Sequence, residues 1–140
     1  MNNGKSFIKQ SEMNRELENT LVATYPAIYR SLEPRYSGAC RFECDDGWYH
    51  LIEELSRKLE AKACTTGLLA VEVGEKLGSL RVLFRGDVTS TVDGWLAEIA
   101  SQSRRTCERC SRPAMLRRRK EGRVRTLCPT CAAAMDYVLE

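Results

Sequence analysis

Two pairs of cysteines constrain this chain more than any other feature of its sequence. Two residues separate the cysteines within each pair, and seventeen residues separate the pairs. Cysteines at this spacing in a tight turn point both sulfur atoms into one pocket, so two pairs can surround one Zn²⁺ ion tetrahedrally. The spacing is typical of a zinc ribbon. We therefore expect a closed structural zinc site formed by Cys107, Cys110, Cys128 and Cys131.

The rest of the composition indicates a single small protein with reduced thiols. Its 140 residues match one domain, or one domain with a small appendage. No apolar run approaches the roughly 18 residues of a membrane span, and the first ten residues contain no apolar signal-peptide core. Seven cysteines, an odd number, argue against a disulfide framework. We expect a cytoplasmic protein that does not contact membranes.

Charge is distributed unevenly along the chain. Residues 101–131 carry ten of the 22 Lys and Arg residues and only two acids, whereas residues 1–100 have a small excess of acids. We expect an α+β body over residues 1–104 and a zinc ribbon with a short C-terminal helix over residues 105–140. Since no Gly-, Ser- or Pro-rich spacer separates the two parts, the ribbon is expected to dock on the body.

Helical periodicity predicts three helices in the body. Apolar residues recur at helical spacing over residues 12–25, 46–63 and 90–103. The central helix has the clearest pattern, and Asp45 or Asp46 is expected to cap its N-terminus. Its predicted core-facing side chains are Trp48, Leu51, Ile52, Leu55 and Leu59.

Alternating periodicity predicts strands in two places. Residues 68–74 and 79–86 alternate apolar and polar side chains around a Gly-bracketed turn, which favours an antiparallel hairpin. Two strands alone are marginal in water, so helices must cover one face or another strand must join. In the ribbon, residues 115–120 and 123–127 are predicted to form strands. The residues after Cys131 are predicted to form a helix that packs back.

The ribbon hairpin concentrates positive charge on a metal-stabilised element. Such a display can bind phosphates or an acidic protein surface, or it can simply keep a small ribbon soluble. Nucleic acid, an acidic or nucleoprotein partner, and a solvated hairpin remain as alternatives. The candidate contact residues are Arg112, Arg117, Arg118, Arg119, Lys120, Arg123 and Arg125.

Two further groups of residues resemble binding sites weakly. Cys40, Cys44, His50 and Cys64 do not have a standard zinc spacing, and we interpret them as buried free cysteines and a surface histidine. Interleaved Tyr and Arg residues over 25–36 can stack on single-stranded bases, but we favour the interpretation that these tyrosines cover the edge of the core.

An enzymatic function has little support. A metal-dependent nuclease needs converging carboxylates and a lysine, and the candidates are Glu43, Asp45, Asp46, Glu72, Glu75 and Lys76. The acids before residue 47 are better explained as a helix cap. The chain has one histidine and no Gly-rich phosphate loop, which disfavours most acid–base and nucleotide enzymes. Two knuckles in one chain also argue against a thioredoxin-like redox centre. We predict no catalytic residues.

Three segments together resemble an uncharacterised family of small proteins of bacteriophages, prophages and related mobile elements. They are FECDDGWYHLIEELSRKLE, VEVGEKLGSLRVLFRG and CERCSRPAMLRRRKEGRVRTLCPTC, about two thirds of the chain. The family pattern has a Gly-Asp-Gly-Trp helix start, a Lys-Glu-Lys-Phe-Gly-Gly-Leu-Arg hairpin and a Cys-x-x-Cys-Gly knuckle followed by Arg-Thr-Leu-Cys. Here Asp45, Leu77, Ser79 and Ser111 depart from it.

The resemblance implies a bacterial cytoplasmic setting and supplies no activity. Combined with the charge pattern, it favours a non-enzymatic zinc-binding accessory protein that binds a host protein or nucleoprotein complex. Inhibition of a defence system such as CRISPR-Cas is one concrete version. A nucleic-acid-binding regulator of transcription or replication is the alternative, and a nuclease is the second alternative.

Overall fold

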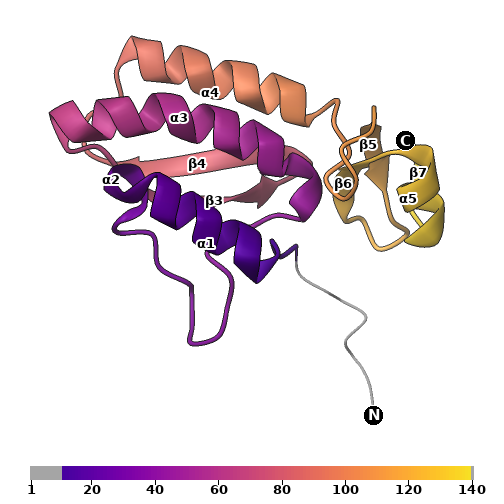
Figure 1. The fold of residues 1–140 in the computed structure, drawn as a ribbon. Helices are drawn as coiled ribbons and strands as arrows, with labels where there is room; N and C mark the ends of the chain where they lie inside the picture. The colour runs from indigo at the N-terminus through magenta and orange to yellow at the C-terminus, as the bar shows by residue number, and fades with distance from the viewer. Residues whose placement is uncertain (1–10, 140) are drawn as a thin grey trace.

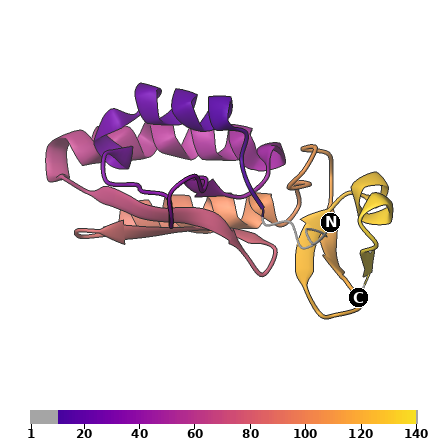
Figure 2. The same cartoon turned by 90° about the horizontal axis from the view of Figure 1, so that it is seen from below.

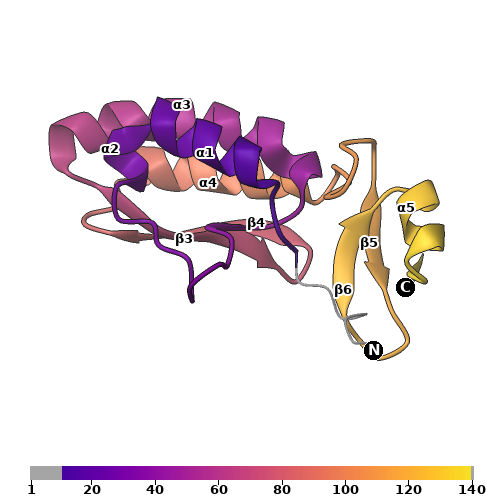
Figure 3. The ribbon, with the colours of Figure 1, turned by 60° about the horizontal axis from the view of Figure 1, so that its bottom comes forward.

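The computed structural model describes residues 11–139. Residues 1–10, in which we expect no signal-peptide core, lie outside this range. The fold is α+β (Figure 1). A three-stranded sheet has the order β2-β3-β4, with strands β2 (Phe42–Glu43), β3 (Leu69–Lys76) and β4 (Ser79–Arg85). Figure 3 shows helices α1 and α3 together above the sheet.

Helix α3 (Tyr49–Thr66) is the centre of the body core. It follows a short 3-10 turn, η1 (Asp46–Trp48), and ends at Gly67, whose φ of 78° provides the left-handed C-cap that glycine favours. The five core-facing side chains predicted from its periodicity are all buried. That prediction is confirmed.

The other helices of the body surround α3. Helix α1 (Arg15–Thr24) begins after Asn14, whose side chain accepts hydrogen bonds from the backbone N–H groups of Glu16 and Leu17. Proline at the first position starts α2 (Pro26–Tyr29), as expected where an N–H needs no partner. Helix α4 (Ser90–Ser103) contacts both α3 and β4.

The predicted caps of the central helix are wrong. Asp45 Oδ1 accepts a hydrogen bond from Glu12 N at 3.1 Å, and Asp46 Oδ1 accepts one from Asn14 N at 2.7 Å. Neither carboxylate caps its own helix. Instead, the two aspartates hold the segment that leads into α1, which lies more than 30 positions earlier in the sequence.

The body sheet gains the additional strand that two strands require. The predicted antiparallel hairpin is confirmed as β3 and β4, and β2 pairs with β3 in parallel. A buried carboxylate on α1 positions this short strand, because Glu18 Oε2 accepts hydrogen bonds from the backbone N–H groups of Arg41 and Phe42 at 2.6 and 2.8 Å.

The ribbon part contains a second sheet of order β6-β5-β7. Its strands are β5 (Met115–Arg118), β6 (Val124–Leu127) and β7 (Val138–Leu139), with α5 (Pro129–Ala134) before the last strand. The predicted C-terminal helix is therefore too long. Helix α5 ends at Ala134 because the chain turns at Asp136, whose φ is 63°, and Tyr137 N bonds back to Ala132 O at 2.9 Å. Tyr137 is buried there, whereas Val138 and Leu139 are exposed.

None of the helices over residues 11–139 has the length and apolar character needed to cross a bilayer.

Candidate metal centre

The four predicted cysteine ligands come together at one end of the molecule. Their Sγ atoms all lie within 4.8 Å of one another, and Cys110 Sγ is 3.5 Å from Cys128 Sγ. Zinc–sulfur bonds of about 2.3 Å place the sulfurs of a tetrahedral site about 3.8 Å apart. The cluster therefore has the size needed to hold a metal ion. Cys107 and Cys128 are buried, and Cys110 is exposed.

Local backbone structure directs these thiols toward one point. Cys128 is the N-cap of α5, and its Sγ accepts a hydrogen bond from Cys131 N at 3.4 Å. This bond lowers the pKa of the Cys128 thiol to about 6, whereas burial raises the pKa of Cys131 to about 12. A metal ion at this site would hold all four cysteine ligands in the deprotonated form.

The first knuckle turns sharply at a residue that is not glycine. Ser111 has a φ of 75°, a conformation that a side chain usually disfavours, and Ser111 N bonds to Cys107 O at 3.0 Å. The serine hydroxyl donates to Gly47 O at 2.7 Å. The side chain thus provides a hydrogen bond to the body that glycine cannot make.

A buried ion-pair network joins the first knuckle to the body. Glu108, between two of the ligands, has no exposed surface, and its Oε2 accepts from Asp45 N at 2.9 Å. Arg125 Nε donates to Glu108 Oε1 at 3.0 Å, and Arg125 Nη2 donates to Asp45 Oδ2 at 2.6 Å. Burial raises the pKa of Glu108, and the charge of Arg125 opposes that rise.

The backbones of the two parts also approach closely at Gly47. Gly47 N donates to Glu108 O at 2.6 Å, and Trp48 Nε1 donates to Thr106 O at 2.8 Å. A Cβ atom on Gly47 would lie 2.3 Å from Cys107 O and 2.4 Å from Glu108 O. Only glycine permits this contact. Sequence reasoning named Cys107 but missed Gly47 and Glu108, although both lie within motifs that it used.

The structure separates the seven predicted basic contacts into two groups. Arg117 and Arg125 are buried, and Arg117 Nε donates to Leu127 O at 2.7 Å. These two candidate contact residues therefore expose little surface to a partner, because neighbouring groups of the ribbon and body use their guanidinium N–H groups. The exposed or half-buried residues are Arg112, Arg118, Arg119, Lys120 and Arg123.

The weaker cysteine and tyrosine groups behave mostly as core residues. Cys40 and Cys44 are buried as expected, and burial raises the pKa of Cys40 to about 11. Cys64 is exposed, so its predicted burial is wrong. His50 is exposed as expected. Within residues 11–139, the only group with metal-binding geometry is the cluster of four cysteines.

The interleaved Tyr and Arg segment contributes two side chains to the core. Tyr25 and Tyr29 are buried, and the Tyr29 ring packs edge-on against Phe42 at 5.1 Å between centroids. Tyr36 is 65% exposed. The interpretation of these tyrosines as cover for the core is therefore confirmed for Tyr25 and Tyr29.

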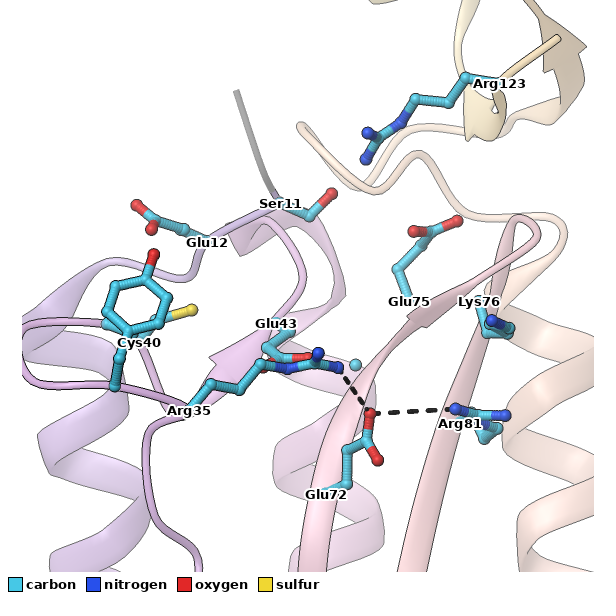
Figure 4. Close-up of a pocket in the computed structure, with 13 residues that line it drawn as sticks. Ser11, Glu12, Arg35, Cys40, Glu43, Glu72, Glu75, Lys76, Arg81 and Arg123 are labelled. Atoms are coloured by element: carbon cyan, nitrogen blue, oxygen red, sulfur yellow. Dashed lines mark hydrogen bonds and ion pairs between the residues drawn. The ribbon is translucent and has the colours of Figure 1, made fainter. Parts of the chain in front are cut away.

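A pocket of about 340 Å³ lies beside the body sheet and reaches the ribbon at Arg123 (Figure 4). Four residues of the nuclease alternative line it, namely Glu43, Glu72, Glu75 and Lys76. Glu43 and Glu72 both pair with Arg35. Arg35 Nη2 lies 3.1 Å from Glu72 Oε2. In this arrangement the carboxylates converge on a guanidinium group rather than on each other. Within residues 11–139, the acids that line the pocket do not form a group with metal-binding geometry.

Comparisons of the chain with protein-family models, with curated proteins and with solved structures find no match. The resemblance to mobile-element proteins therefore stays a prediction.

Proposed function

We propose that the metal of the cysteine cluster is Zn²⁺ and that its role is structural. Four thiolates in tetrahedral reach favour zinc over harder cations. All four ligand positions are provided by the chain, which leaves no coordination position for a substrate. The site then fixes the first knuckle, and through Glu108 it fixes the contact with the body.

Metal analysis tests this assignment directly. We expect about one zinc per chain in reduced, folded protein, and its loss in Cys107→Ser. Cys64→Ser is the matched control, because Cys64 is exposed and outside the cluster. Folded, reduced protein without zinc, or equal zinc in both variants, would contradict the proposal.

We infer that the zinc-bound ribbon and the body act as one rigid unit. The support comes from the buried Glu108–Arg125–Asp45 network and from the close contact at Gly47. A rigid unit presents side chains without the entropy cost of ordering a flexible segment at the moment of binding.

We propose that the protein is a non-enzymatic accessory factor that binds a nucleoprotein complex through the tip of its ribbon hairpin. The observation that carries this proposal is the group of solvent-accessible cations at the tip, where Glu121 is the only acid between β5 and β6. We call this group the basic tip. It consists of Arg118, Arg119, Lys120 and Arg123.

One cation of the basic tip, Arg119, makes two contacts within the ribbon. Arg119 Nε lies 3.2 Å from Glu121 Oε2, and its guanidinium lies 5.6 Å from the centre of the Tyr137 ring. Both contacts hold the side chain in place while leaving it partly accessible. A fixed cation of this kind is suited to phosphate groups, whose positions along a strand are regular.

The biological setting is proposed from the resemblance to mobile-element proteins. In the cytoplasm of a bacterial host, a small protein of this kind can bind a host defence complex such as CRISPR-Cas and inhibit it stoichiometrically. The alternative of a transcription or replication regulator uses the same basic tip on nucleic acid alone.

Salt-dependent binding to labelled nucleic acid tests the role of the basic tip. We would measure fluorescence anisotropy with a 20-base-pair DNA duplex and with a single-stranded RNA between 50 and 200 mM salt. Each lost phosphate contact reduces the slope of log K against log salt by about 0.9 on duplex DNA. Replacing Arg119, Lys120 and Arg123 by Gln should therefore reduce the slope by up to about 3.

A charge-matched variant separates this effect from net charge. Replacing Arg30, Lys62 and Arg85 by Gln removes three cations from the body, and we expect the slope to change little. No binding at 50 mM salt would refute contact of the basic tip with nucleic acid, and so would equal losses in the two variants.

A further inference from the structure

The turn between β3 and β4 contains an exposed leucine in an unfavourable backbone conformation. Leu77 and Gly78 have φ angles of 54° and 84°, the pattern of a two-residue hairpin turn that favours Asn-Gly. A bulky side chain at positive φ is rare. Leu77 is nevertheless 72% exposed, so burial of its side chain in the fold does not compensate for the strain.

Leu77 lies at the place where the body meets the ribbon. Figures 2 and 3 show the end of the β3–β4 hairpin next to β6. Thr126 Oγ1 donates to Gly78 O at 2.6 Å, and a Cβ atom on Gly78 would lie 2.3 Å from Leu116 Cδ1. The Leu116 side chain therefore covers the turn, and it is itself 40% exposed.

A third apolar side chain lies on the same face of the ribbon sheet. Val138 of β7 pairs with Arg118 of β5, and Leu116 lies two positions before Arg118, so Leu116 and Val138 point to the same side. Val138 is 64% exposed. We call Leu77, Leu116 and Val138 the apolar patch. Exposed apolar groups that gather from different elements mark interaction sites more often than isolated ones do.

Cations dominate the surroundings of the apolar patch. Lys76 precedes Leu77 and is exposed, and Arg104 Nη1 donates to Ser79 Oγ at 3.2 Å on the other side of the turn. One acid, Glu75, lies nearby, and its Oε2 accepts from Gly78 N at 2.8 Å. A ligand that combines apolar side chains with negative charge is therefore complementary to this surface.

We propose that the apolar patch docks an acidic protein segment whose apolar side chains contact Leu77 and Leu116. The charge complementarity guides the approach of such a segment, and the apolar contacts supply most of the affinity. The basic tip and the apolar patch have no side chain in common. Contact of the basic tip with nucleic acid can therefore fail while the apolar patch still binds its partner.

The patch also spans two parts of the molecule. Leu77 belongs to the body, whereas Leu116 and Val138 belong to the ribbon. Binding therefore requires the ribbon to keep its position on the β3–β4 turn. Removal of the metal should weaken partner binding for this reason, although no cysteine belongs to the apolar patch.

The probe is a labelled 15-residue acidic peptide with Leu and Phe at helical spacing among Asp and Glu. A second peptide keeps the charges and replaces Leu and Phe by Ser. We expect the first peptide, titrated into zinc-loaded protein, to shift the backbone amide NMR signals of residues 77, 78 and 116. The second peptide should bind at least about tenfold more weakly, the change expected when buried leucine-sized contacts are removed.

Leu77→Asn separates recognition from folding. Asn accepts positive φ and creates the favoured Asn-Gly turn, so the melting temperature should stay unchanged or rise by a few degrees. Affinity for the first peptide should nevertheless fall about tenfold. Leu83→Thr is the control, because Leu83 is a 40% exposed strand residue outside the patch, and it should leave the affinity unchanged.

Several outcomes would overturn the proposal. These are no binding of the first peptide at 1 mM, equal binding of both peptides, or an unchanged affinity in Leu77→Asn. A concentration-dependent dimer that Leu77→Asn abolishes would assign the patch to a second copy of the chain. An oligonucleotide of equal charge that shifts the same three amides would assign it to nucleic acid.

Discussion

Gly47→Ala adds a single methyl group at the contact between the body and the first knuckle. The added Cβ would lie 2.3 Å from Cys107 O and 2.4 Å from Glu108 O, whereas carbon–oxygen contacts need more than 3 Å. Both atoms are backbone, so a side-chain rotation cannot relieve the overlap. The knuckle and η1 must move apart by about an ångström to reach that contact distance.

That movement disrupts hydrogen bonds with known lengths. The bond from Gly47 N to Glu108 O is 2.6 Å, and those from Ser111 Oγ to Gly47 O and from Trp48 Nε1 to Thr106 O are 2.7 and 2.8 Å. Each contributes about 1 kcal/mol, and a buried group left without a partner costs about 1 to 3 kcal/mol. We expect the free energy of unfolding to fall by about 2 to 4 kcal/mol.

Thermal and urea unfolding of the zinc-loaded protein provide the assay. A loss of this size lowers the melting temperature by roughly 6 to 15 °C for a chain of this length. Gly94→Ala is the matched control: Gly94 lies in α4 and a Cβ atom there has open space. Because alanine favours helix, it should stabilise by about 0.5 to 1 kcal/mol.

The comparison has a clear refuting result. If Gly47→Ala unfolds within about 0.5 kcal/mol of the original protein, the width of ordinary surface substitutions, the close contact between knuckle and body does not exist in solution. Reduced zinc affinity together with reduced stability would show that the contact and the metal site depend on each other.

Three further perturbations test other parts of the structure. Arg125→Met leaves the buried Glu108 carboxylate without its partner and should cost about 3 to 5 kcal/mol in urea unfolding; adding Glu108→Gln should recover part of that loss, and no recovery would contradict the pairing. Iodoacetamide at pH 7.5 should modify Cys64 before Cys40 in zinc-loaded protein by mass spectrometry, because Cys64 is exposed while burial raises the pKa of Cys40 to about 11; equal rates would refute the burial. Hydrogen bonds from Tyr25 and then Arg57 lower the pKa of Glu53 in the folded protein below 4.5. The ionised Glu53 carboxylate therefore stabilises the fold above pH 4.5, and this stabilisation disappears as the pH falls through the lowered pKa. The free energy of unfolding of Glu53→Gln should fall less steeply below pH 4.5 than that of the original protein, and parallel curves would count against the interaction.

Local patterns determined the elements whose physics is local. The periodicity from Trp48 to Leu59 specified a buried helix face because residues three and four apart share one side of a helix. The alternation of apolar and polar residues predicted the β3–β4 hairpin, because successive side chains of a strand point to opposite faces of the sheet. Both CxxC pairs could also be recognised as ligand pairs, since each pair lies within a single turn. The convergence of the two pairs followed from their spacing.

Tertiary structure alone decided how charged residues are used. In the sequence, Arg125 is one more cation of a basic hairpin. In the structure it is buried, because it pairs with Asp45, 80 positions earlier, and with Glu108 of the first knuckle. Asp45 and Asp46 read as a helix cap, yet they bind the segment before α1. A charge pattern gives the sign of each side chain but not its distance from an opposite charge.

The same limit explains the close contact at Gly47 and the exposed Leu77. A glycine in a helix-start motif and a leucine in a turn are ordinary in sequence, and only the approach of the ribbon gives them their environment. The cysteines determined that the chain can hold a metal ion, because ligand spacing is a short-range property. The packing of the ribbon against the body decided which cations and apolar side chains remain on the surface, because burial depends on residues far apart in the chain.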